Sequence, residues 1–161
     1  QSGNPAAMAV YARRLERDGR CATTKQADIC AQWYARAIDD GSLYAMDRFA
    51  KIAGFHDGQL EPTELARINA HAILAEMLGS TDSAWVLIGR NADGSPRRAT
   101  EIERQSAQGE VAGLLSAIND RRRSRGLEPL SPDARPLRTP EEAELFAMAT
   151  PSDPVLSWPR R

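Results

Sequence analysis

The residues that could carry chemistry in this chain are few and far apart. Its two histidines are His56 and His71, and its two cysteines, Cys21 and Cys30, lie nine residues apart, so no group has the spacing of a zinc site. The sequence contains no glycine-rich phosphate loop, no H-E-x-x-H motif and no G-x-S-x-G motif. We therefore predict a protein that is not an enzyme and that needs no metal and no cofactor.

A small enzyme is an alternative, with a site around Glu101, Glu103 and His71. His71 falls on an apolar packing face, where a partly buried imidazole with a hydrogen-bond partner is the usual role. The paired acids Asp39 and Asp40 fall at a predicted helix end, where solvated or capping carboxylates are more typical than general acids or bases. An enzyme would be supported only if mutation of Glu101, Glu103 and His71 abolished an activity.

The cysteines leave two states open. Either both thiols are free and Cys30 is a small buried residue, or Cys21 and Cys30 form a disulfide that closes a short loop in an oxidising compartment. Cys21 lies in the polar segment "RDGRCATTKQ", where an exposed thiol would oxidise readily. The chain starts with "QSGNPAAMAV", which lacks both an initial methionine and the features of a signal peptide, so a removed leader and an exported location stay compatible with it.

Charge and hydropathy narrow the class of partner. The 161 residues carry 21 Lys and Arg against 22 Asp and Glu, and a net charge of −1 gives no long-range attraction to nucleic acid or to an anionic membrane. The run "RRRSR" from Arg121 to Arg125 falls at a predicted helix end, where cations oppose the negative end of the helix dipole. No apolar run approaches the roughly 20 residues that span a bilayer. We expect neither nucleic-acid binding nor membrane insertion.

Helical periodicity recurs along the chain and strand signals are almost absent, which predicts an all-α fold in one domain. The apolar spacing places Ala7, Tyr11 and Leu15 on the core face of the first helix. Thr100 and Glu103 have the spacing of a capping box. The stretch over 126–161 is rich in proline and is expected to be irregular apart from one short helix. We expect helices over about 4–18, 24–41, 42–53, 62–79, 81–89, 101–123 and 140–149.

An internal repeat organises the first part of the chain. Gly3, Gly41 and Gly79 follow one another at intervals of 38 residues, and Ala37 is matched by Ala75 at the same interval. A helix-turn-helix unit with small residues at its close-approach positions cannot bury its apolar face alone. Successive units should therefore stack into a short right-handed α-solenoid with a period of about 38 residues.

The repeat resembles the Sel-one-like repeats, which are relatives of the tetratricopeptide repeats. The segment "CAQWYARAIDDG" matches the second-helix pattern A-x-x-W-Y-x-K-A-A-x-x-G of that family, with Cys30 where alanine is usual, whereas the second unit has His71 and Ala72 in place of the Trp-Tyr pair. The matching positions of the first unit are Gly3, Ala7, Tyr11, Ala12, Leu15, Cys30, Trp33, Tyr34, Arg36, Ala37 and Gly41. The resemblance covers about residues 3–90. We predict a helical repeat domain over 1–125 and a proline-rich C-terminal extension over 126–161 that packs on it.

The resemblance implies a module that binds another protein through the first helices of its units. The polar residues expected on this surface are Arg13, Arg17, Asp47, Arg48 and Lys51. Short proteins of the family include exported bacterial immunity proteins that bind and neutralise a cognate secreted toxin, and this favours a periplasmic immunity protein. The alternative is a regulatory adaptor or scaffold, with a cytoplasmic location.

Overall fold

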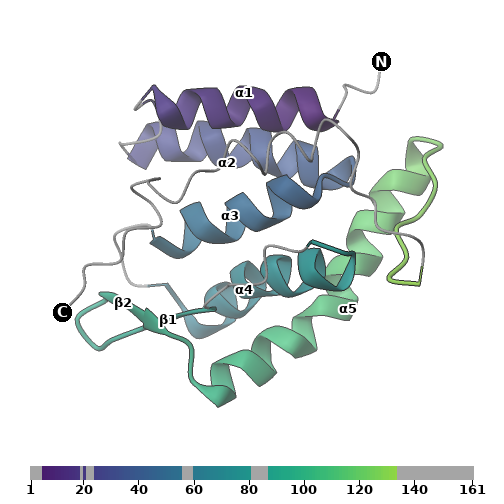
Figure 1. Ribbon diagram of the computed structural model, residues 1–161. Coiled ribbons are helices and arrows are strands. Elements are labelled where there is room, and N and C mark those ends of the chain that lie inside the picture. The colour runs from purple at the N-terminus through teal and green to yellow at the C-terminus, as the bar shows by residue number, and fades with distance from the viewer. Residues whose placement is uncertain (1–4, 19, 21–23, 56–59, 81–86, 134–161) are drawn as a thin grey trace.

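The protein is mostly helical within the ranges that its structure describes. The computed structural model describes residues 5–18, 20, 24–55, 60–80 and 87–133, and at 5, 6, 16, 24–29, 31 and 51–55 it describes the backbone alone. Five helices and one antiparallel two-stranded hairpin follow one another along these ranges (Figure 1). Their bounds are α1 Pro5–Arg17, α2 Thr24–Asp39, α3 Leu43–Phe55, α4 Pro62–Met77, β1 Ile88–Arg90, β2 Pro96–Arg98 and α5 Glu101–Ser124.

The bounds of the first four helices repeat with a fixed period. α1 and α3 both have 13 residues, and their first residues, Pro5 and Leu43, are 38 positions apart. α2 and α4 both have 16 residues, and their first residues, Thr24 and Pro62, are also 38 positions apart. The helices therefore have the spacing that the glycines have in the sequence. A right-handed superhelix of such units stays a prediction.

α2 and α4 end in the same backbone turn. Gly41 has a φ of 93° and Gly79 a φ of 101°, in the left-handed region that favours glycine. In both turns the serine that follows, Ser42 or Ser80, donates its amide to the alanine carbonyl five positions earlier at 2.9 Å. The Ser42 hydroxyl also accepts the Ala45 amide at 3.1 Å, which caps the start of α3. One Gly-Ser pair thus ends a helix and starts the next.

Each helix packs against the next one along the chain, and α5 packs along α4 with its end against α2 (Figure 1). Fully buried alanines allow the helices to approach closely, and larger side chains fill the space between them. Each large apolar side chain that is buried contributes about 2 kcal/mol relative to exposure. The main core includes Ala9, Ala12, Tyr34, Ala37, Leu43, Tyr44, Ala45, Met46, Ala70, Leu74 and Ala75.

Polar side chains fix the two ends of α5. At its start the Thr100 hydroxyl accepts the Glu103 amide at 3.3 Å, and the Glu103 carboxylate accepts the Thr100 amide at 2.6 Å, so the predicted capping box is confirmed. Near its end the Asn119 side chain donates to the Leu130 carbonyl at 2.9 Å and accepts the Leu130 amide at 2.7 Å. The segment that follows α5 is therefore held against the helix.

The structure corrects the prediction of a helix over 81–89. Residues 81–86 lie outside the described ranges, but Ile88–Arg90 is strand β1 and pairs with β2. The buried Asn69 side chain of α4 holds this strand, because it donates to the Ile88 carbonyl at 2.8 Å and accepts the Ile88 amide at 3.1 Å. Local periodicity could not reveal the strand, since its polar partner lies 19 positions earlier.

The predicted core face of the first helix is wrong at two positions. Ala7 and Tyr11 are exposed, whereas Ala9, Ala12 and Leu15 are buried. α2 is the main neighbour of α1 among the described elements, so only a narrow face of α1 can be covered. The small side chains of Ala9 and Ala12 allow the close approach, and Tyr11 lies at the edge of the contact.

Several predictions fall outside the described residues. These are the short helix over 140–149 and the irregular tail that follows it. The division into parts over 1–125 and 126–161 also stays a prediction.

Candidate functional site

The residues predicted to bind a partner do not share one exposed surface. On α1, Arg17 is exposed and Arg13 is half-buried, whereas on α3 Asp47 and Arg48 are only 2% and 1% exposed. The Lys51 side chain lies outside the described part of the chain. The expectation that Asp47 and Arg48 avoid the core is therefore wrong.

The reason lies in the central position of α3, which packs against α2 on one side and α4 on the other (Figure 1). Every residue over 42–48 is buried, so the start of this helix has no exposed face. Periodicity separates a polar face from an apolar one only where one side of a helix meets solvent. The polar side chains on this part of α3 are internal groups rather than a contact surface.

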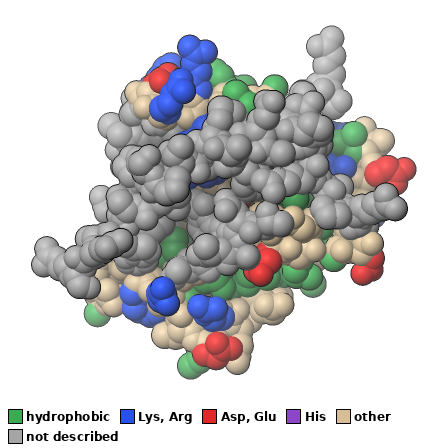
Figure 2. Space-filling view, in the orientation of Figure 1, with side chains coloured by type: hydrophobic (Ala, Val, Ile, Leu, Met, Phe, Trp, Pro, Cys, Tyr) green, Lys and Arg blue, Asp and Glu red, His purple; other side chains and the backbone are tan. Residues whose placement is uncertain are grey.

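An exposed face of apolar, aromatic and arginine side chains lies instead along α1 and the adjoining side of α2. Val10 and Tyr11 are 46% and 44% exposed. The Arg14 and Arg17 side chains are 72% and 76% exposed. In Figure 2 basic side chains (blue) lie beside hydrophobic ones (green) over the α1 end of the molecule, at the top of the view. We use the name α1–α2 face for the surface formed by Val10, Tyr11, Arg14, Arg17, Trp33 and Arg36.

The aromatic part of this face is ordered by ring contacts. The Tyr11 and Trp33 rings meet edge to face, with centroids 4.9 Å apart and an interplanar angle of 66°. The Arg36 guanidinium lies over the Trp33 ring, 5.7 Å from its centroid, at the distance of a cation-π contact. Two helices therefore present one continuous aromatic edge flanked by a cation.

Arg14 and Arg17 of α1 share an acidic neighbour. The Nε atoms of Arg14 and Arg17 each lie 3.9 Å from a carboxylate oxygen of Asp18. Pairs of this length between exposed side chains contribute at most about 1 kcal/mol, because water screens them. Both guanidinium groups therefore keep most of their capacity to bind a carboxylate from elsewhere.

Three of the four arginines in the run at the end of α5 make contacts with the end of α2, whereas Arg123 is exposed and pairs with Asp120 on its own helix. Arg121 donates to the Asp39 carboxylate at 2.6 Å, and Arg122 donates to the Asp40 carbonyl at 2.6 Å. Arg125 pairs with the Asp40 carboxylate and donates to the Asp39 carbonyl at 3.0 Å. Burial lowers the pKa of the Arg122 guanidinium, although the nearby Asp40 charge raises it. These five residues, the α2–α5 junction, satisfy the carbonyl end of α2.

His71 is packed beside this junction. Its Nδ1 lies 2.8 Å from the Arg67 carbonyl and its ring centroid 4.7 Å from that of Phe49. A carbonyl can only accept, so Nδ1 carries the proton and donates. Burial lowers the pKa of His71; the Arg121 charge also lowers it, and the Asp39 charge raises it. The ring is a neutral packing group at pH 7, which matches the structural role predicted for it.

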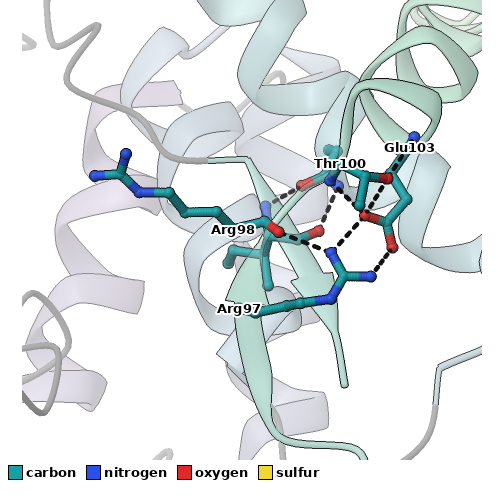
Figure 3. Close-up of polar contacts among 6 residues, drawn as sticks. Arg97, Arg98, Thr100 and Glu103 are labelled. Carbon is teal, nitrogen blue, oxygen red and sulfur yellow. Dashed lines mark hydrogen bonds and ion pairs between the residues drawn. The ribbon is translucent and has the colours of Figure 1, made fainter. Parts of the chain in front are cut away.

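Glu101 and Glu103 make separate contacts at the start of α5, where the Glu101 carboxylate accepts a hydrogen bond from the Gln105 side chain at 3.4 Å. The Glu103 carboxylate accepts two hydrogen bonds from Arg97, at 2.7 and 2.9 Å, and one from the Thr100 amide (Figure 3). The hydrogen bonds from Arg97 hold the pKa of Glu103 below its ordinary value. Among the described contacts none joins either glutamate to His71. The residues of the alternative enzyme site thus have two separate structural roles.

The described residues also bear on metal binding, membrane insertion and disulfide formation. These residues contain no group of three or more His, Cys, Asp or Glu that could hold a metal ion. No helix in the described ranges is both long and apolar enough to cross a bilayer. Cys30 is buried in α2 and is disulfide-bonded. Cys21 lies outside the described residues, so its pairing with Cys30 stays a prediction.

Sequence reasoning selected only Arg17 of the α1–α2 face as a binding residue. A signal for the others exists in the sequence: Val10, Arg14 and Arg17 are spaced four and three residues apart, which places them on one helix face. The assignment of Tyr11 to the core hid this pattern.

Comparisons with known proteins give no relative for this chain. No family model matches it, and neither a curated protein nor a solved structure matches it significantly. The likeness to Sel-one-like repeats therefore rests on the residues alone.

Proposed function

We propose that this protein is a non-enzymatic module that binds another protein through the α1–α2 face. The observation that carries the proposal is the exposure of Val10 and Tyr11 beside two weakly paired arginines, Arg14 and Arg17. Aromatic residues and arginine are the types that dominate binding energy at protein interfaces, because they combine large contact area with directional polar groups. Contacts within the molecule occupy Arg121, Arg122 and Arg125 of the other arginine cluster, which leaves this face as the better binding surface.

The more specific form of the proposal is an exported immunity protein that binds and neutralises a secreted toxin. The disulfide at Cys30 supports export, since disulfides persist in oxidising compartments such as the periplasm. The resemblance to Sel-one-like repeats supports the immunity role by analogy of fold. A regulatory adaptor in the cytoplasm is the alternative. Thiol counting under denaturing, non-reducing conditions separates the two, because two free thiols in the native protein would remove the support for export.

Affinity capture tests the proposal. The purified chain is immobilised and exposed to periplasmic extract and culture medium from the native host, beside the variants Val10→Glu and Met77→Glu. Val10 and Met77 are exposed to nearly the same extent on different helices, so the second variant is a matched control. We expect the native chain and Met77→Glu to retain one protein in stoichiometric amount, and Val10→Glu to lose it.

The retained protein is then purified and titrated against the native chain by calorimetry. A one-to-one complex, with inhibition of the partner if it is a toxin, supports the proposal. The proposal is wrong if no protein is retained, or if Val10→Glu retains the same protein as well as the native chain does.

A further inference from the structure

We infer that the α1–α2 face takes an acidic segment of the partner that also carries an apolar anchor. This inference rests on the proposed function and specifies the chemistry of the partner. The face is divided along its length: Val10 and Tyr11 form its apolar part, and Arg14 and Arg17 form its basic part. A partner segment that matches both parts must present an apolar residue first and carboxylates beyond it.

The dimensions follow from helix geometry. Val10 and Arg17 are separated by two helical turns, or about 10 Å along the axis of α1. A partner helix of similar length places an apolar side chain on Val10 and acidic side chains one and two turns away on Arg14 and Arg17. The apolar anchor excludes water from the neighbouring ion pairs, which strengthens them.

The guanidinium groups suit carboxylates in particular. Arginine offers paired N–H donors whose planar geometry matches a carboxylate. The pairs of Arg14 and Arg17 with Asp18 are 3.9 Å long, so an incoming carboxylate that forms shorter hydrogen bonds can replace them. Arg36, over the Trp33 ring, adds a third cation on the α2 side of the face.

Two other occupants fit less well. A second copy of this chain brings its own arginines, and on the described part of this face Asp18 is the one acid seen to pair with Arg14 and Arg17. A nucleic acid is attracted through phosphates over a long range, but the net charge of the chain is −1. An acidic protein segment needs no long-range attraction, because it can bind through the cations of this face alone.

Two synthetic helical peptides of about 15 residues, or four turns, serve as probes. Both carry a leucine anchor near one end; one has glutamates and the other lysines on the same face beyond it. Binding to the full chain is measured by anisotropy of labelled peptide, and the contact is located by amide chemical shifts. We expect the glutamate peptide to bind at least about tenfold more tightly, to weaken with salt, and to shift amides of α1 and α2. Equal binding of the peptides, or no shifts in α1 and α2 at millimolar peptide, overturns the inference.

Charge reversal gives the matched comparison. Arg14→Glu/Arg17→Glu should reverse the preference between the peptides. Arg104→Glu/Arg123→Glu changes the net charge equally at exposed positions of α5 and should preserve the preference. If both double variants act alike, net charge rather than this face controls binding and the inference fails. It also fails if a single-stranded oligonucleotide binds more tightly than the glutamate peptide, or if light scattering shows a dimer that Val10→Glu dissolves.

The same variants separate this inference from the proposed function. If the captured partner binds Arg14→Glu/Arg17→Glu as tightly as the native chain, the inference is wrong while the binding function stands. If no partner is captured but the glutamate peptide shows the expected preference and reversal, the function is wrong while the chemistry of the face stands.

Discussion

Two regions of this molecule use arginine in opposite ways. In the α2–α5 junction, Arg121 and Arg122 donate to a carboxylate and a carbonyl of α2 at 2.6 Å each. On the α1–α2 face, Arg14 and Arg17 have one shared acid at 3.9 Å. The denser arginine cluster in the sequence is the structural one. The role of an arginine therefore depends on what the fold places beside it, and not on how many neighbours of the same charge it has.

Substitution of Gly41 is expected to have the largest effect on the junction. A Cβ at this position would lie 2.8 Å from Arg122 Nη1 and 3.1 Å from Leu130 Cδ2, on a backbone with a φ of 93°. Gly126 also has a positive φ, of 71°, but its Cβ would meet nothing within 4 Å. We expect Gly41→Ala to lower the free energy of unfolding by about 3 kcal/mol and Gly126→Ala by about 1 kcal/mol. Equal losses in urea denaturation would show that Arg122 yields freely and that the junction is loose.

The two acids that neighbour the arginines give the next comparison. The Asp40 side chain is buried at the end of α2 and pairs with Arg125, whereas Asp18 is half exposed. We expect Asp40→Ala to lower the free energy of unfolding by about 2 kcal/mol and Asp18→Ala by less than about 0.5 kcal/mol. The first value is smaller than for a fully buried ion pair, because Arg125 remains partly in water. Urea midpoints of both variants measure this. A similar cost for both would remove the distinction between the two regions.

The pH dependence of stability reports on the junction through His71. Its folded pKa lies below the ordinary 6.5, mainly because the ring is buried, so the unfolded chain takes up the proton first. Stability is therefore full above pH 6.5 and falls as the pH drops below that value, until the folded pKa is passed. We expect the free energy of unfolding of the native chain, measured at pH values from 7.5 to 5, to show this loss. The substitution His71→Phe should reduce the loss.

The range from pH 7.5 to pH 5 also excludes a contribution of Glu103 to the pH dependence of stability. The Glu103 carboxylate has a folded pKa below its ordinary 4.5, so its contribution is lost only at lower pH. Glu103→Gln should therefore leave the slope between pH 7.5 and pH 5 unchanged. An equal slope in His71→Phe and the native chain would contradict the role assigned to the half-buried ring.

The smallest effect on stability is expected at the α1–α2 face. Arg14→Ala and Arg17→Ala remove exposed side chains with long ion pairs, so each should change the free energy of unfolding by less than about 0.5 kcal/mol. Alanine also favours the helix slightly. A loss above about 1 kcal/mol in thermal or urea unfolding would mean that these arginines hold the fold, and the contrast with the junction would disappear.

Much of the helical framework could be predicted from the sequence. The predicted ranges 24–41 and 62–79 located the ends of α2 and α4 to within about two residues, because proline at a helix start and glycine at a helix stop act on the local backbone. The capping box at Thr100 worked for the same reason.

The errors share a different physical cause. The burial of Asp47 and Arg48, and the exposure of Tyr11, depend on which helices cover each face, and that is decided by packing between elements. The strand at Ile88 depends on Asn69 in another element. Local patterns carry no information about such contacts. The spacing of Val10, Arg14 and Arg17 places them on one helix face, but that this face is exposed became clear only from the arrangement of the helices.

The shared Gly-Ser turn has a consequence for how such a chain can change in length. At Gly41 it ends α2, and the following Ser42 caps α3 within the same short segment. A duplication of 38 residues that starts and stops inside this turn copies two whole helices and one complete turn, so the copy begins and ends in a turn that already joins one helix to the next. Growth by tandem duplication therefore requires no new turn to evolve, and the length of the protein can vary in whole helix pairs.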